Sequence, residues 1–195
     1  MDQFIDSVEM EDEVEKASLH RRLEIVKFAC YVVLLISAFW ALMGFIFGYA
    51  SLLGLALLAG LGSLIAIFLI NKEHHLLGRN IWMGMGLLAI TIGCFLVDDA
   101  GNVPFLFASA VGGPFITYSL KYERFWIAFF VLMTIGLWAV HWVLGSNFFG
   151  TVIVGPEIAE TYFELPVVIS TLVVISIQLG SAGLIANTYS EQIYL

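Results

Sequence analysis

Charge is what this sequence has least of. Only 12% of its 195 residues are charged, whereas soluble domains average about a quarter, and 61% are hydrophobic. So few charges cannot cover the surface of a soluble domain of any size. The composition therefore predicts an integral membrane protein whose main partner is the lipid bilayer. The eight basic residues do not form the basic patch of a nucleic-acid-binding protein, which excludes that class.

Cysteine and catalytic motifs are also scarce. Cys30 and Cys94 fall in different apolar segments at opposite depths, so no disulfide between them is expected, and both are expected to be small core residues. No glycine-rich phosphate loop is present, and no His or Lys is placed to activate Ser63. We therefore expect no catalytic residues in this chain.

Six apolar segments make up most of the sequence. Inside lipid, backbone polar groups must be satisfied within the segment, so segments of this length are expected to be helices. The sequence predicts an all-α integral membrane fold, a six-transmembrane helix bundle spanning residues 25–188. The predicted spans are residues 25–48, 51–70, 81–97, 105–120, 125–145 and 166–188.

The basic residues give the predicted bundle an orientation. All of them lie on the side of the bundle that holds both termini, and the opposite side carries only acids. Because cytoplasmic loops are rich in Lys and Arg, both termini are expected to be cytoplasmic in a multi-pass protein of the plasma (inner) membrane. The eight are Lys16, Arg21, Arg22, Lys27, Lys72, Arg79, Lys121 and Arg124.

Residues 1–24 form an acidic cytoplasmic segment, with seven acids against Lys16 in the first twenty residues. A secretory signal peptide begins with basic residues, so this segment is not one. A weak helical stripe of Phe4, Ile5, Val8 and Val14 predicts a cytoplasmic helix that leans on basic inner loops or on a partner chain. A frayed, solvated tail is the alternative.

The acids of the outer side form the first candidate site. Asp98, Asp99, Glu157 and Glu160, together with Glu164, have no basic partner there. Clustered carboxylates repel one another unless a cation or a donor lies between them. The intramembrane His141 is the nearest additional ligand, and carboxylate with imidazole suits a divalent cation. These residues predict an outer ligand or cation pocket; a solvated acidic rim, with His141 hydrogen-bonded inside the bundle, is the alternative.

The last span contains the second candidate site. Gln178 lies near its middle, and an amide in hydrocarbon must find a partner on another helix. The small residues Ser176, Gly180 and Gly183 would allow another helix to approach closely. The pattern predicts either pairing across the axis of a homodimer or packing within one bundle. Residues 189–195 are expected to begin a cytoplasmic coupling helix.

The order of features resembles one family. Arg21-Arg22 precedes a first span containing the run from Ser37 to Met43, and spans one and two are tightly paired. An acidic turn, Asp98 to Gly101, is followed by Phe105-Leu106-Phe107. Then come Lys121-Tyr122-Glu123-Arg124, a Pro-bearing outer loop and a sixth span rich in Ser, Thr and Gly. Together these are similar to the six-helix membrane domain of bacterial class III adenylate cyclases, mycobacterial type included.

The resemblance implies a function for the bundle. In that family the sixth helix leads through a coupling helix to a catalytic domain that works as a homodimer. The resemblance therefore implies a receptor or anchor domain that regulates an attached cytoplasmic cyclase, and so cAMP signalling. Asp98, Asp99 and His141 would correspond to an outer cavity that binds a lipid or a cation. Alternatives are the input domain of a histidine kinase or diguanylate cyclase, an anchor without a ligand, and a stand-alone six-span transporter.

Overall fold

The computed structural model describes the backbone of residues 2–193 and the side chains of residues 17–186. This part of the chain is helical and contains no β-strand. The principal helices are α1 (Asp2–Ile46), α2 (Ala50–Asn71), α3 (His75–Leu96), α4 (Phe105–Thr117), α5 (Arg124–Leu144) and α7 (Glu164–Ile193). Shorter elements lie between them: η1 (Asp99–Gly101), α6 (Pro156–Ile158) and the π-helical turn η2 (Ala159–Phe163).

Five of the principal helices are long and apolar enough to cross a membrane. The prediction of an all-helical membrane bundle is confirmed at that level. The exception is α4, whose 13 residues rise about 20 Å at 1.5 Å per residue. The hydrocarbon layer is about 30 Å thick, so α4 does not cross it alone. Six complete crossings remain a prediction.

Helix boundaries depart from the predicted spans mainly at the end of the bundle that carries the basic turns, which is called the inner end after its predicted orientation. The polar run after residue 70 reads as a loop in the sequence, yet α3 begins at His75. Only a short turn separates α2 from α3, and in it Glu73 takes a left-handed φ of 65°. At the N-terminus the backbone of the acidic segment is helical and continuous with the first span, forming one 45-residue helix.

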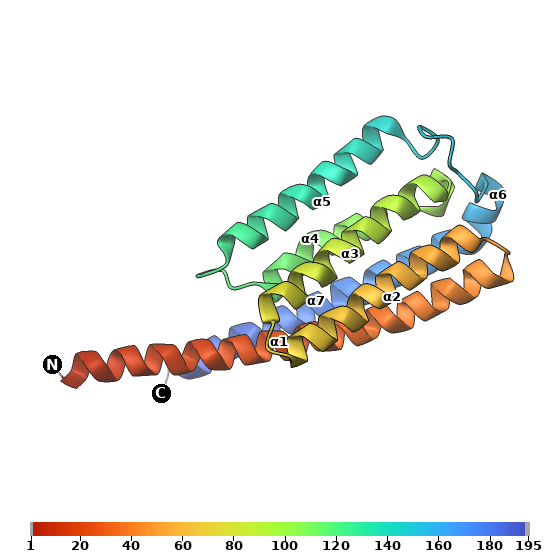
Figure 1. The fold of residues 1–195 in the computed structure, drawn as a ribbon. Helices are drawn as coiled ribbons and strands as arrows, with labels where there is room; N and C mark the ends of the chain where they lie inside the picture. The colour runs from red at the N-terminus through yellow and green to blue at the C-terminus, as the bar shows by residue number, and fades with distance from the viewer. Residues whose placement is uncertain (1, 194–195) are drawn as a thin grey trace.

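The helices are arranged so that both chain ends leave the bundle at the same end (Figure 1). α1, α2 and α3 pack in sequence order, and α4 lies against α1, α3, α5 and α7. α5 lies at the edge, against α3 and α4 (Figure 1). α1 and α7 contact each other and extend together beyond the bundle on the side of the basic turns (Figure 1).

Glycines let neighbouring helices approach closely at two contacts. A Cβ built on Gly44 of α1 would lie 2.8 Å from the backbone nitrogen of Leu53 in α2. One built on Gly62 of α2 would lie 2.6 Å from the Cβ of Met85 in α3. Real Cβ atoms do not approach so closely, so these glycines set the spacing of α1, α2 and α3.

The outer loop after α5 is tied to the outer end of α3. The backbone nitrogens of Ile153 and Val154 donate to the oxygen of Leu96, and the nitrogen of Asp98 donates to the oxygen of Val154. Val154 and Phe163 are fully buried in the main core cluster. The loop therefore closes the outer end of the bundle and delivers the chain to α7.

Candidate functional site

The outer acids occupy different environments. The carboxylate of Asp98 accepts a hydrogen bond from the nitrogen of Ala100 at 3.1 Å and so caps η1. Asp99 is exposed, and its Oδ1 lies 3.3 Å from Nε2 of the buried His141. Glu157 and Glu160 are exposed on α6 and η2. Of the predicted set, the structure brings only Asp99 and His141 into contact.

This arrangement does not form a metal-binding cluster. Among the residues that the structure describes, no three of the His, Cys, Asp and Glu side chains are placed to hold a metal ion. The remaining outer acid, Glu164, accepts from the amide of Asn102 at 3.1 Å and joins α7 to the η1 turn. Asp98, Asp99 and Glu164 thus bond to the local backbone or to neighbouring elements, whereas Glu157 and Glu160 are exposed.

His141 joins α5 to the rest of the outer end. Its ring lies edge-on to Phe95 of α3, with ring centroids 5.4 Å apart. Its Nδ1 is buried and has no hydrogen-bond partner in the described part of the chain. Because α5 otherwise packs only at the edge of the bundle, the contacts of His141 with Asp99 and Phe95 fix its outer end.

Gln178 has a partner within its own chain. Its amide nitrogen donates to the backbone oxygen of Ser109 in α4 at 2.5 Å. Its carboxamide lies against Gly112, where an added Cβ would collide with it. The contact therefore fixes the spacing between α4 and α7. Of the two interpretations that the sequence allows, this geometry corresponds to packing within one bundle.

The small residues predicted for dimerisation lie on the outside of the bundle. Ser176, Gly180 and Gly183 are exposed. A Cβ added to either glycine would meet nothing within 4 Å. Their spacing of four and three residues places them on one face of α7. This face is open to another helix, and the homodimer stays a prediction.

A cavity of about 230 Å³ lies between five of the helices. Its walls come from α1, α2, α3, α4 and the π-turn with α7, and none comes from α5. The lining is mostly apolar and includes small residues such as Ala59, Gly86 and Ala110, which leave the space. Polar groups reach it from Ser37, Ser63, Ser109, Ser170 and Gln178.

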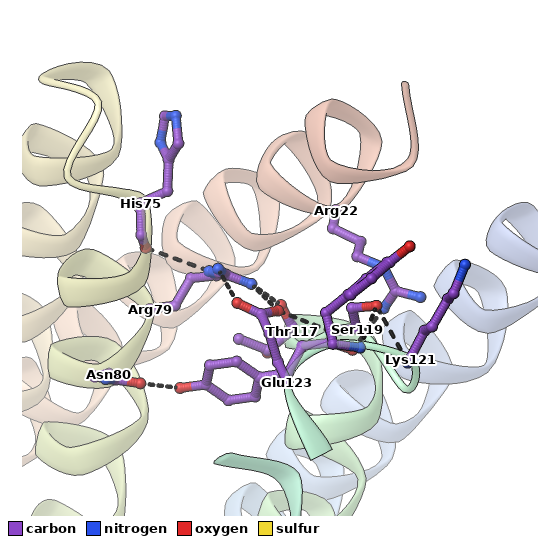
Figure 2. A network of polar contacts seen from close by, with 10 residues as sticks. Arg22, His75, Arg79, Asn80, Thr117, Ser119, Lys121 and Glu123 are labelled. Atoms are coloured by element: carbon purple, nitrogen blue, oxygen red, sulfur yellow. Dashed lines mark hydrogen bonds and ion pairs between the residues drawn. The ribbon is translucent and has the colours of Figure 1, made fainter. Parts of the chain in front are cut away.

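The inner end of the bundle holds a buried ion pair that the sequence analysis missed. Arg79 of α3 is 2% exposed, and its two terminal nitrogens donate to the two carboxylate oxygens of Glu123 at 2.8 and 2.6 Å (Figure 2). Arg79 also donates to the backbone oxygen of Thr117 at 2.8 Å. Glu123 in turn accepts from the nitrogen of Ser119 at 2.8 Å (Figure 2). The pair therefore joins α3 to the turn between α4 and α5.

A second buried arginine reaches the same turn from α1. Arg22 is 4% exposed and donates to the backbone oxygens of Tyr118 and Phe115 at 2.9 and 3.3 Å. The last carbonyls of a helix lack partners within it and carry partial negative charge, so cations stabilise them. Arg22 and Arg79 together complete the buried C-terminal end of α4 (Figure 2).

Tyr118 packs into the centre of this network. Its hydroxyl donates to the Oδ1 of Asn80 at 2.6 Å, and its ring stacks on Phe130 of α5. The guanidinium of Arg79 lies 5.2 Å from the centre of the same ring.

A sequence signal for the ion pair of Arg79 and Glu123 exists. Glu123 is an acid within an otherwise basic turn, and Arg79 follows the α2–α3 turn at the start of an apolar segment. Ionisable residues near a span are expected to pair with one another.

Comparison of the chain with protein-family models, with curated proteins and with solved structures finds no match. The resemblance to cyclase membrane domains therefore rests on the order of sequence features.

Proposed function

We propose that this chain is a membrane receptor and anchor domain, in which α7 transmits a change within the bundle to an attached cytoplasmic domain. The output suggested by the resemblance is a class III adenylate cyclase acting as a homodimer. The proposal includes six membrane crossings, with both termini cytoplasmic in the plasma membrane. The outer end, with its Asp99–His141 contact, is the side from which a lipid or cation would act.

One observation carries the proposal: α7 runs from the turn that carries Asp99, along the cavity wall, to the end of the bundle where the chain leaves it. It begins in the outer loop beside η1, contributes Val167, Ser170, Val174 and Gln178 to the cavity wall, and continues past the bundle. Its 30 residues correspond to about 45 Å, against about 30 Å of hydrocarbon. A rigid rod of this length can carry a shift or rotation from the membrane to its inner side.

The position of α1 supports the same role. It is in contact with α7 and leaves the bundle beside it (Figure 1). At 1.5 Å per residue its 45 residues correspond to about 68 Å. Its Arg22 holds the end of α4, and α4 holds α7 through Ser109 and Gln178. A movement of α7 is therefore coupled mechanically to the helix beside which it leaves the membrane.

An experiment that changes the rotation of an output domain relative to α7 tests whether α7 acts as a transmitter. Residues 1–195 are fused to a class III cyclase catalytic domain, and cAMP is measured in membranes of a cyclase-deficient bacterial host. Insertions are placed between Ala186 and Asn187. Because a helix turns about 100° per residue, one added residue rotates the output domain by about 100°, whereas seven added residues rotate it by only about 20° from its starting direction.

The receptor role predicts that the one-residue insertion changes cyclase activity several-fold and that the seven-residue insertion restores it. Equal activity for both insertions and the parent fusion would refute transmission through α7. The double variant Asp99→Asn with His141→Ala is expected to shift activity in the same assay. The matched change Glu157→Gln with Glu160→Gln, on exposed acids, is expected to leave it unchanged.

Cysteine labelling tests the orientation. In a background with Cys30 and Cys94 replaced by Ala, Glu160→Cys should react with a membrane-impermeant maleimide in intact cells. Lys72→Cys should react only after the membrane is opened. The reverse pattern would place the basic turns outside and would overturn the proposal.

A further inference from the structure

We propose that the cavity between α1, α2, α3, α4 and α7 is a binding site for an uncharged, apolar molecule that carries one hydrogen-bonding oxygen. The site is distinct from the outer acids and lies among the helices that hold α7. The effect of this binding on signalling rests on the receptor role proposed above. The binding itself can be measured without any cyclase output.

The lining excludes a charged ligand. No Asp, Glu, Lys, Arg or His is among the residues that line the cavity. A charge transferred there from water would have no counter-charge, which carries a very large desolvation penalty. Most of the wall is aliphatic, with the aromatic surfaces of Trp40, Trp82 and Phe163 added. The fitting ligand is therefore a hydrocarbon chain or ring without an ionised group.

The size of the cavity bounds the ligand. A cavity of about 150 Å³ lined by apolar side chains is large enough to bind benzene, which has six heavy atoms. The 230 Å³ of this cavity would by proportion accept about nine heavy atoms. This corresponds to a medium-chain alcohol or a single-ring terpenoid rather than to a whole phospholipid.

Two hydroxyl groups provide the polar contact. Ser37 of α1 and Ser170 of α7 line the cavity and are more than nine-tenths buried. Neither hydroxyl has a hydrogen-bond partner among the described residues, whereas the hydroxyls of Ser63 and Ser109 bond to their own helices. Neither oxygen is among the fully enclosed unpaired atoms of the described residues, so both are open to the cavity. Polar groups in apolar surroundings are normally paired, and a ligand oxygen can supply that partner.

Binding there would act on the transmitting helix. Ser170 and Val174 place α7 in the cavity wall, and Ser37 places α1 in it. α1 and α7 are the two helices that leave the bundle side by side (Figure 1). A ligand that contacts both walls would favour one spacing of these helices over another. A ligand shifts such an equilibrium only by its differential affinity for the two arrangements.

Bromine quenching of tryptophan fluorescence tests the site. Trp40 and Trp82 line the cavity, and the exposed Trp138 and Trp142 are replaced by Phe to reduce quenching from the bilayer. The chain is purified in lipid nanodiscs, and the probe is 8-bromooctan-1-ol, which has ten heavy atoms. Its charged counterpart, 8-bromooctanoate at pH 8, serves as the ligand control. We expect saturable quenching by the alcohol, and affinity for the carboxylate at least about 100-fold weaker.

Matched variants on one helix locate the binding. Gly86 lines the cavity and Gly84 does not, and a Cβ added at either meets nothing within 4 Å. Gly86→Leu should therefore fill the cavity and weaken binding of the alcohol at least about tenfold, since even one methylene matters in such a pocket. Gly84→Leu adds the same side chain to the same helix outside the cavity and should leave binding unchanged. Ser37→Ala with Ser170→Ala should weaken it about fivefold, through loss of one hydrogen bond.

Each outcome decides the proposal. Quenching that does not saturate, or that is equal in the Gly86→Leu and Gly84→Leu variants, overturns the site. If Gly86→Leu fails to fold, as judged by size-exclusion chromatography, Ala110→Leu fills the same cavity from α4 and replaces it. Saturable quenching without phase-dependent cyclase activity would leave the site standing and remove the receptor role. Phase-dependent cyclase activity without saturable quenching would overturn the binding site and leave the receptor role standing.

Discussion

Replacing Glu123 by Gln is the sharpest test of the inner network. The change keeps the shape of the side chain but leaves Arg79, which is 2% exposed, without its counter-charge. Two hydrogen bonds from Arg79 and one from the nitrogen of Ser119 lose their charged acceptor. Breaking one partner of a buried ion pair costs about 3–5 kcal/mol. Because Arg79 keeps the oxygen of Thr117 and the side chain of Glu123 is 21% exposed, we expect the lower end, about 3 kcal/mol.

Thermal unfolding of the purified chain in detergent measures this loss. For a chain of this size a change of 1 kcal/mol shifts Tm by about 2–4 °C, so Glu123→Gln should lower Tm by about 6–12 °C. Glu24→Gln is the matched control, because Glu24 pairs with Lys27 on the same helix and its side chain is 53% exposed. A surface pair of this kind contributes less than about 1 kcal/mol.

The double variant Arg79→Met with Glu123→Leu distinguishes the free-energy cost of an unpaired buried charge from that of a lost contact. If the cost comes from leaving one charge unpaired, removing both charges should be less destabilising than Glu123→Gln alone. A Glu123→Gln variant as stable as Glu24→Gln would refute the reasoning. A double variant less stable than the sum of its single changes would also refute it.

Two further changes test helix contacts by the same measurement. Gly112→Ala places a Cβ against the carboxamide of Gln178, so it should displace that group from its hydrogen bond to the oxygen of Ser109 and lower stability by about 1–3 kcal/mol. Gly180→Ala, with nothing within 4 Å, should leave Tm unchanged or slightly raised, and equal effects of the two changes would contradict the packing. Tyr118→Phe removes the hydroxyl that donates to Asn80 at 2.6 Å and should cost about 1–2 kcal/mol, whereas an unchanged Tm would mean that this hydrogen bond contributes nothing.

Helical segments and their approximate places could be predicted from the sequence, because lipid allows few alternatives. An apolar run without charge must satisfy its backbone internally, so α2 and α5 begin and end within one residue of their predicted spans. The start of α3 could not be predicted in the same way. Its first five residues include His75 and Arg79, polar residues that read as a loop until the burial of Arg79 against Glu123 is known.

The candidate sites also combine features that the sequence predicts with features that only the structure shows. The outer acids are conspicuous in the sequence, yet only Asp99 and His141 meet, because Asp98 caps its own turn. Whether Gln178 faces its own bundle or a second copy depends on the rotation of α7, which the mixed small and apolar residues of that helix do not specify. In the structure the side chain of Gln178 contacts Ser109 and Gly112 of its own chain, and the dimer contact stays a prediction.

The sequence by itself determined that this protein belongs in a membrane, that it is helical and that its basic residues gather at the end holding both termini. These properties follow from composition and order, since hydrophobicity and backbone hydrogen bonding act segment by segment. Only the tertiary structure decided that two arginines are buried at the end of α4 and that five helices line a partly open cavity that includes Ser37 and Ser170. Those features depend on how side chains from distant helices meet, and the local sequence signals, such as the lone acid Glu123 in a basic turn, do not specify which side chains meet.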